Sequence, residues 1–312
     1  MADPSSCRLI WGCDPGRQFE QAWVNSLLKP AEQVAAWNQD LMPDGIRGRS
    51  QVLVESGLLR LERSPAPARL AALHQQRLAR LKVLAAGGPF GLVHLSDEEG
   101  IDGDVLYPLL PEGTVIWRNF SHRRHRDHWN ASVFPIGPRA ELLQPSVEQT
   151  SRLTASQRQY PWAFMGTLWS GGSRTLAASL FLHALPQGFF YGGQNFGQGL
   201  PVGAYTDVLL QSCFALCPEG DRHLDTFRLH ESLQAGCIPV VVDQRQMAAD
   251  LLGERAPLPV FHNWLDALHW VKGMISKPDV LDNTQATISN WWQERRNGLA
   301  HAMRHTFDRT IN

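Results

Sequence analysis

The chain has 312 residues, of which 43% are hydrophobic and 19% charged, and its formal net charge is -1 at pH 7. This length suits two domains of ordinary size, and the composition is typical of globular rather than disordered chains. A nearly neutral chain carries no excess of basic residues for nucleic acid or for an anionic membrane surface, so neither is expected as a partner.

The first half of the chain alternates short apolar runs with helical patterns. Strands are expected at four places: 8–11, 90–95, 114–119 and 132–137. Residues 51–56 fit either a strand or the start of a helix. Helical periodicity covers 18–37, with an interruption at Pro30, and 67–88, which stops at Gly87 and Gly88.

The second half repeats this alternation after a polar stretch at 144–160, which we interpret as the connection between two domains. Strands are expected at 162–168, 188–193, 213–218 and 237–242. Helices are expected at 175–185, 205–212, 226–236 and along the tail at 264–309. Such alternation predicts two doubly wound α/β domains with parallel sheets, whose ligands bind beyond the carboxyl ends of the strands.

Targeting and cysteine signals are sparse. The N-terminus has no basic region followed by a long apolar run, and no stretch of about 18 apolar residues occurs. The five cysteines are an odd number and form no CxxC pair, which favours reduced thiols and argues against a zinc site. We therefore predict a cytoplasmic protein without a membrane span.

Residues 213–243, "CFALCPEGDRHLDTFRLHESLQAGCIPVVVD", place a charged loop and a helix between two apolar strands. Asp225 or Thr226 suits the N-cap of that helix. The free N–H groups of its first turn form a site for phosphate, and Arg222, His223 and Arg228 add positive charge. The stretch therefore predicts a phosphate site at the edge of the sheet.

Glu231 follows Arg228 by three residues and lies on the same helix face. Its carboxylate could accept hydrogen bonds from two ribose hydroxyls. The alternative is an ion pair with Arg228. Gly236 fits the cap that ends this helix before the next strand.

This stretch resembles the C-terminal signature of the exostosin family of glycosyltransferases, in which a strand and a Pro–Gly loop precede "FR", "E" and "GCIPV". "WAFMGTLWSGGSR" is similar to the opening of that family's nucleotide-binding domain. "LVHLSDEEG" and "IWRNF" are similar to the N-terminal half of its ribitol xylosyltransferase branch.

The resemblance implies a GT-B fold, in which two Rossmann-like domains face each other across a cleft. It implies an N-terminal acceptor-binding domain at 1–150, a C-terminal nucleotide-sugar-binding domain at 151–285, and a helix at 286–312 that packs back on the first domain. The implied reaction moves a sugar, with inversion, from a UDP-linked donor to a hydroxyl of a glycan or polyol. Because no anchor is evident, a soluble bacterial-type member is expected.

No metal or other cofactor is expected, because helix N–H groups and arginines can stabilise the leaving diphosphate instead. The residues expected to bind the donor are Gly166, Arg174, Pro218, Gly220, Arg222, Thr226, Phe227, Arg228 and Glu231. Asp102 and Asp104 spell the DxD pattern of metal-dependent transferases. They follow no clear strand, and we assign them to a loop.

Inversion also needs a base that takes the proton from the acceptor hydroxyl. Asp97 and Glu98, which follow the strand at 90–95, are the catalytic candidates, although a carboxylate cluster can also be a solvated turn. His94, Arg118 and Asn119 are expected to bind the acceptor. The basic run at 121–129 is either a solvated loop or a receiver for an anionic acceptor.

Two other functions stay open. The chain could be a nucleotide-sugar-binding scaffold that has lost catalysis, or a nucleotide-sugar epimerase of similar two-domain build. The acidic cluster at 97–99 favours the enzyme over the scaffold. A dehydrogenase is disfavoured, since no G-x-G-x-x-G follows the first strand.

Overall fold

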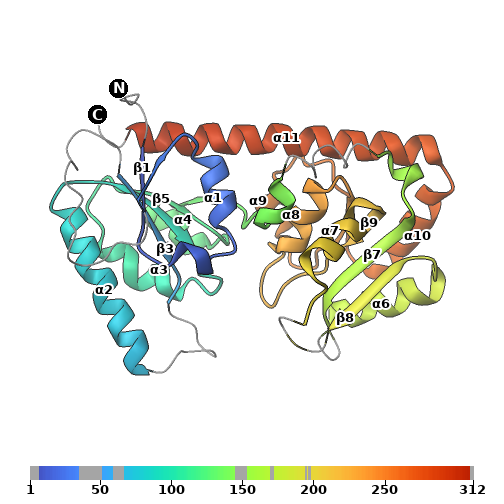
Figure 1. The fold of residues 1–312 in the computed structure, drawn as a ribbon, viewed down its shortest axis with the longest axis horizontal. Helices are drawn as coiled ribbons and strands as arrows, with labels where there is room; N and C mark the ends of the chain where they lie inside the picture. The colour runs from blue at the N-terminus through green and yellow to red at the C-terminus, as the bar shows by residue number, and fades with distance from the viewer. Residues whose placement is uncertain are drawn as a thin grey trace. The chain divides into compact units, whose positions relative to one another are not determined.

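The computed structural model describes residues 7–34, 51–58, 67–144, 153–168, 172–193, 195 and 198–309. These residues form two compact units. Unit 1 contains the chain up to Ile136 together with the segment from Arg296 onward, and unit 2 runs from Gly137 to Arg295. The predicted boundary at 150/151 lies outside the described residues. Figure 1 shows α11 (Pro278–Arg309) as one continuous helix, and its residues are shared by both units.

Unit 1 is built on a six-stranded parallel sheet in the order β2-β1-β3-β4-β5-β6. Its strands are β1 (Arg8–Trp11), β2 (Glu32–Val34), β3 (Gln51–Ser56), β4 (Gly91–Leu95), β5 (Val115–Arg118) and β6 (Ser132–Val133). Its helical elements are η1 (Pro15–Arg17), α1 (Gln21–Leu27), α2 (Pro67–Ala85), α3 (Ile101–Leu106), η2 (Tyr107–Leu109) and α4 (Arg123–Trp129).

The core of unit 1 follows from its apolar strands. Leu9, Leu53, Leu92 and Val93 have no exposed surface. Strands of a parallel sheet that are covered on both faces read as continuous apolar runs, as these do. Leu81 and Leu84 of α2 belong to one buried cluster with Leu53 and Leu92.

Unit 2 is built on a five-stranded parallel sheet in the order β11-β10-β9-β7-β8. Its strands are β7 (Tyr160–Thr167), β8 (Phe189–Gly193), β9 (Ser212–Leu216), β10 (Ile238–Val242) and β11 (Val260–Phe261). Its helical elements are η3 (Ala140–Leu143), η4 (Ala155–Gln157), α6 (Ser173–Ala184), α7 (Val202–Leu210), α8 (Phe227–Gln234), α9 (Ala248–Leu252), α10 (Trp264–Ile275) and the first part of α11.

Aromatic side chains tie the helices of unit 2 to its sheet. Trp162 of β7 meets Phe181 of α6 edge to face, with ring centroids 5.5 Å apart. Phe181 in turn contacts Trp264 of α10, whose indole nitrogen donates a 2.7 Å hydrogen bond to Ser173. The α6 and α10 helices also pack on each other, and both are labelled in Figure 1.

Most predicted elements are confirmed, and two are wrong. Helical periodicity predicts that residues beyond Pro30 stay helical, yet Glu32–Val34 form β2, because proline interrupts helical hydrogen bonding and the chain re-enters the sheet. Asp102 and Asp104 lie in helix α3 rather than in a loop. The side chain of Asp97 accepts hydrogen bonds from the backbone N–H groups of Asp102 and Gly103, at 3.2 and 2.9 Å, and so satisfies the first turn of α3.

Gln285 of α11 holds three backbone groups of unit 2 together. Its amide nitrogen donates to the carbonyls of Leu153 (3.0 Å) and Gly236 (2.8 Å), and its amide oxygen accepts from the N–H of Ala155 (2.8 Å). Gln285 is buried. The side chain therefore fixes α11 to the segments that precede β7 and β10.

We expect Gln285→Ala to lower the free energy of unfolding of unit 2 by about 2–3 kcal/mol, because three buried backbone groups lose their partners. Native-state hydrogen exchange of the β9 amides measures this change. The control is Gln293→Ala on the exposed face of the same helix, for which a change below about 0.5 kcal/mol is expected. Equal effects of the two variants would contradict this role for Gln285.

Candidate functional site

The sheet of unit 2 has a topological switch point between β7 and β9. From β7 the chain crosses to β8 on one side, and it later returns to β9 on the other side. The loops that follow β7 and β9 therefore lead away from each other at the carboxyl edge of the sheet. In open α/β sheets this is the place where ligands bind. The predicted donor-binding residues follow these two strands.

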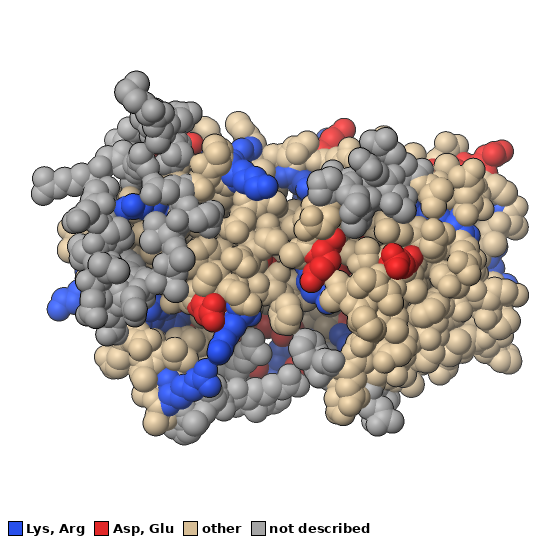
Figure 2. Space-filling model, in the orientation of Figure 1, with Lys and Arg blue, Asp and Glu red and all other residues tan. Residues whose placement is uncertain are grey.

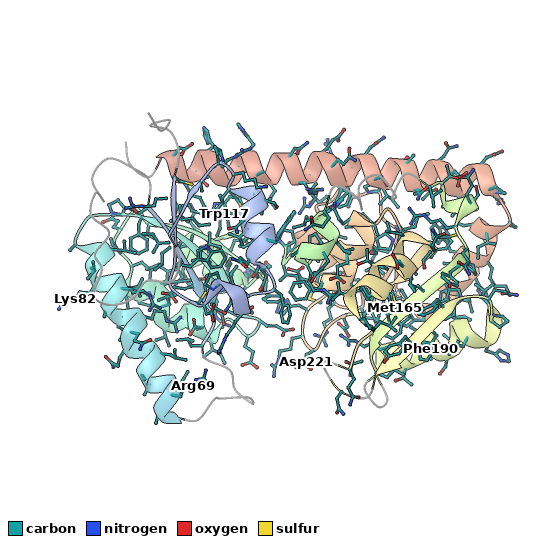
Figure 3. The ribbon with its side chains drawn as sticks, in the orientation of Figure 1. Arg69, Lys82, Trp117, Met165, Phe190 and Asp221 are labelled. Atoms are coloured by element: carbon teal, nitrogen blue, oxygen red, sulfur yellow. The ribbon has the colours of Figure 1, made fainter. Side chains whose placement is uncertain are left out.

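Arg174 bridges the two sides of the switch point. Its guanidinium donates to the carbonyl of Thr167 at the end of β7 (3.1 Å) and to the carbonyl of Glu219 in the loop after β9 (3.3 Å). In the same loop the N–H of Gly220 donates to the carbonyl of His223 (2.7 Å), which closes a turn. Arg222 offers its carbonyl to Arg245 (2.9 Å). The structure thus brings Arg174 and Gly220 to the carboxyl edge of the sheet. Pro218 lies in the same loop as Gly220, and Figure 3 labels Asp221 in this loop.

Arg228 lies flat against the end of β7. Its Nε donates to the carbonyl of Met165 (3.1 Å), and its guanidinium carbon is 4.7 Å from the centre of the Phe164 ring. A Cβ on Gly166 would come within 2.0 Å of Nη2 of Arg228, so only glycine leaves room for the guanidinium. The sequence predicts Gly166 and Arg228 as site residues, and the structure brings them together. Figure 3 labels Met165 on β7 and Phe190 on the neighbouring β8.

Two polar atoms at the start of α8 lack partners among the described residues. Thr226 is the N-cap of α8, but its side chain makes no capping hydrogen bond, and its buried hydroxyl is unpaired. Nη1 of Arg228 is also buried without a partner. An unpaired buried donor costs free energy, and a helix N-terminus favours anions. Phe227, the first residue of α8, is half-buried beside them.

Glu231 is buried, and each of its oxygens has a partner. Oε1 accepts a hydrogen bond from Nε of Arg139, and Oε2 accepts one from the hydroxyl of Tyr205 at 2.6 Å. Neither partner was predicted from the sequence. The alternative ion pair with Arg228 is not formed in the described part of the chain. The ribose role of Glu231 stays a prediction, and it would require one of these partners to leave.

The predicted residues of unit 1 form a buried polar network at the carboxyl edge of its sheet. Asp97, which follows β4, holds Arg118 of β5: Nη2 of Arg118 donates to the carbonyl (2.7 Å) and to the carboxylate (3.1 Å) of Asp97. Asn119 accepts from the N–H of Ser96 and donates to the carbonyl of Phe134, each at 3.3 Å. Asp97, Arg118 and Asn119 are all buried.

His94 continues this network toward α2. Its Nε2 donates to Oδ2 of Asp102 at 2.9 Å, and its Nδ1 lies 2.9 Å from the hydroxyl oxygen of Tyr107. Arg77 donates twice to Asp102, at 2.5 and 2.9 Å. Burial by itself raises the pKa of Asp102, but hydrogen bonds and charges from His94 and Arg77 outweigh it and hold that pKa well below 3.8.

His94, Arg118 and Asn119 are all buried and hydrogen-bonded within unit 1. Their placement therefore does not support direct contacts with an acceptor. Asp97 is likewise engaged on both oxygens, because it caps α3. Glu98 differs: it is half-buried, and its carbonyl accepts from Nε2 of His122 at 3.0 Å. Of the three acidic residues that follow β4, Asp97 is buried, whereas Glu98 and Glu99 are half-buried.

Most of the basic run at 121–129 forms helix α4 (Arg123–Trp129) rather than a loop. Its exposed side chains include Arg123, which pairs with Asp127 at 3.3 Å, and Arg124, which pairs with Asp104 at 2.7 Å. Arg126 and His128 are exposed on the same helix. On the face drawn in Figure 2, acidic and basic side chains are dispersed among uncharged ones over the described residues.

Within the described residues, no group of three or more His, Cys, Asp or Glu side chains is arranged to hold a metal ion. The carboxylate of Asp102 is taken by Arg77 and His94, so the DxD pattern does not present two open carboxylates. The part of the chain that the structure describes also contains no helix with the length and apolar character needed to cross a bilayer.

The fold places the protein in a known structural class. The DNA modifying enzyme β-glucosyltransferase, solved with and without its substrate uridine diphosphoglucose, aligns with a TM-score of 0.51 at 11% identity over 98% of this chain and 99% of that one. T4 phage BGT in complex with UDP and Mn²⁺ aligns with a TM-score of 0.50 at 12% identity over the same shares. The fold is GT-B, as the sequence predicts.

The sequence narrows this class to one family. The Exostosin GT47 domain matches residues 110–267, about half of the chain. The chain therefore belongs to the exostosin GT47 family of glycosyltransferases, which confirms the resemblance of residues 213–243.

Two curated proteins are similar to part of the chain. Human ribitol-5-phosphate xylosyltransferase 1 is 27% identical over 184 residues, which are 55% of this chain and 40% of that protein. The Danio rerio protein of the same name is 25% identical over 177 residues, which are 52% of this chain and 38% of that protein. The chain thus matches less than half the length of either relative.

Proposed function

We propose that this protein transfers a sugar from a nucleoside diphosphate donor, with uridine as the nucleoside, to a hydroxyl of a glycan or polyol. The observation that carries the proposal is the start of α8, where the hydroxyl of Thr226 and Nη1 of Arg228 are buried without partners among the described residues. Both lie at the switch point of a sheet that falls within the family match. A diphosphate at this place supplies the acceptor oxygens that these donors lack.

The donor site acts on the leaving group. When the bond between the anomeric carbon and the diphosphate oxygen breaks, its electron pair stays on the diphosphate. The N–H groups at the start of α8 and the guanidinium of Arg228 are fixed in advance where this charge develops, so they stabilise the transition state more than the ground state. Arg174, already held by Thr167 and Glu219, adds a second cation at the edge. This arrangement favours catalysis without a metal ion.

Glu98 is the base in this proposal. It takes the proton from the acceptor hydroxyl while the acceptor oxygen forms its bond to the anomeric carbon from the face opposite the diphosphate, which inverts that carbon. Asp97 is less suited to this task, because both of its carboxylate oxygens accept hydrogen bonds from the first turn of α3. The exposed arginines of α4 support an acceptor that carries a negative charge, and the relatives named above act on a ribitol phosphate according to their names.

The test is a transfer assay with UDP-, GDP- and ADP-linked sugars and with polyol phosphates and neutral glycans as acceptors, run with and without EDTA. We expect UDP release that depends on an acceptor, survives EDTA and gives a product of inverted anomeric configuration by NMR. We expect Glu98→Gln to lose this activity while keeping its affinity for UDP. Binding of UDP without transfer to any acceptor would instead favour a scaffold, and a retained configuration would contradict the proposed mechanism.

A further inference from the structure

Arg139 lies near the beginning of unit 2, immediately before η3, and no sequence pattern predicts a role for it. The η3 segment packs on α7 and α8, so it brings Arg139 against the helix that starts at the donor site. Nε of Arg139 donates to Oε1 of Glu231, and the guanidinium carbon lies 5.0 Å from the centre of the Tyr205 ring. The orientation of the guanidinium is therefore fixed from two sides.

Tyr205 and Glu231 are the buried part of this cluster, and Arg139 is its open part. Burial, followed by the charge of Glu231, raises the pKa of Tyr205 well above 10, so its hydroxyl keeps the proton that it donates to Glu231. The side chain of Glu231 is 2% exposed and that of Arg139 is 28% exposed. Only Nε of Arg139 has a partner among the described residues, and its two Nη groups are not buried.

The charges in this cluster do not cancel. One carboxylate, that of Glu231, pairs with Arg139, while the charges of both Arg139 and Arg228 act on the buried hydroxyl of Tyr205. Arg228 lies one helical turn before Glu231 and has Nη1 unpaired. Two guanidinium groups with open N–H donors favour a ligand that carries negative charge and several acceptor oxygens.

We propose that Arg139 is a further donor-binding arginine beside Arg228 and Arg174, and that Glu231 and Tyr205 position it instead of binding the ribose. The ligand is the diphosphate of a nucleoside diphosphate, which Arg139 contacts through its Nη groups together with Arg228. This inference rests on the proposed function, because it takes the diphosphate at the start of α8 as given. It differs from the expectation for Glu231, which assigns that carboxylate to the ribose hydroxyls.

The experiment compares UDP with uridine, which has the ribose and the base but no phosphate. Calorimetric titration of Arg139→Ala should show UDP affinity reduced by about tenfold or more, with uridine affinity changed by less than about twofold. Arg255→Ala, which removes an exposed arginine of the same unit, should bind both ligands as the wild type does. Retention of wild-type UDP affinity by Arg139→Ala would overturn the inference.

Glu231→Gln separates positioning from ribose binding. Its amide oxygen can still accept from Nε of Arg139, so we expect uridine binding to be unchanged and UDP binding to fall by less than about threefold. A parallel loss of uridine and UDP affinity would show a ribose contact and would contradict the positioning role. Tyr205→Phe keeps the ring under Arg139 but removes the hydrogen bond to Glu231, and it should lower UDP affinity by about two- to fivefold without affecting uridine.

Folding is controlled in the same series. If Arg139→Ala leaves Glu231 uncompensated and fails to fold, the double variant Arg139→Gln with Glu231→Gln replaces the ion pair by a neutral hydrogen bond. We expect this variant to lose UDP affinity by the same factor as Arg139→Ala and to keep uridine affinity. A wild-type protein that binds no nucleoside diphosphate would refute the proposed function itself, whereas wild-type binding that is untouched in both Arg139 variants would refute only this inference.

Discussion

Replacing Arg228 with alanine should weaken the binding of UDP by about 10- to 100-fold while the protein remains folded. A charge-assisted hydrogen bond contributes about 1.5–3 kcal/mol, and each 1.4 kcal/mol corresponds to a factor of about ten in affinity. Little native structure depends on Arg228, because its contacts are one carbonyl hydrogen bond and the face of Phe164, and its Nη1 has no partner among the described residues. Calorimetric titration measures the loss of affinity.

Gly166→Ala provides an independent check on the same guanidinium. Its added Cβ would meet Nη2 of Arg228 at 2.0 Å, so the arginine must move although its charge is kept. We expect UDP affinity to fall by about tenfold in this variant. Arg255→Ala serves as the control for Arg228→Ala, because it also removes one positive charge from the same unit. If Gly166→Ala bound UDP like the wild type, the guanidinium would not be required where the structure places it.

Asp102→Ala should lower the free energy of unfolding of unit 1 by about 3–5 kcal/mol, the largest stability effect that we expect in this chain. The substitution leaves Arg77 buried without its carboxylate and removes the acceptor of Nε2 of His94. Removing one partner of a buried pair is costly because the other charge stays in a poorly solvating environment. Native-state hydrogen exchange of the β4 amides measures the change.

Asp104→Asn is the matched control, since Asp104 lies on the same helix two residues away. Its carboxylate is 45% exposed and pairs with Arg124, which is 46% exposed, so solvent screens this charge pair. Asparagine keeps an oxygen for the buried Nε2 of His125, which lies 2.8 Å from Oδ1 of Asp104. A loss of less than about 1 kcal/mol is expected for Asp104→Asn. Similar losses for Asp102→Ala and Asp104→Asn would mean that burial of the Arg77 pair does not govern the stability of unit 1.

The same carboxylate should make unit 1 sensitive to acid. The pKa of Asp102 in the folded chain lies below its usual value of 3.8, so its ionised form stabilises the fold. That stabilisation is complete above pH 3.8 and is lost as the pH falls through the lower pKa of the folded state. The stability difference between the wild type and Asp102→Ala should therefore narrow below pH 3.8, and a constant difference would contradict this assignment.

The sequence predicts the elements around the proposed donor site well, because their signals are local. A strand, a loop and a helix start lie within residues 213–231, and the geometry of α8 follows from them. The position of Gly166 on the neighbouring strand follows from parallel pairing. Arg139 could not be predicted, since its partner Glu231 lies 92 residues away in the chain and no local pattern marks the contact.

The surroundings of the catalytic and acceptor-binding residues predicted in unit 1 could not be predicted from the sequence. Asp97, His94 and Arg118 end apolar strands, which is also the position of ligand-binding residues in parallel sheets. Their enclosure depends on Arg77 of α2 and Tyr107 of η2, which approach through tertiary packing that the sequence does not encode locally. The helical state of Asp102 and Asp104 likewise depends on the Asp97 cap.

The most direct test of the account is a titration of the wild-type protein and of Arg228→Ala with UDP, GDP, ADP and inorganic phosphate, each with and without EDTA. The account predicts that the wild type binds UDP most tightly, that EDTA leaves this affinity unchanged, and that Arg228→Ala loses about tenfold or more of it. Equal affinity of the two proteins for UDP, or binding that disappears with EDTA, would contradict a metal-free diphosphate site at the start of α8.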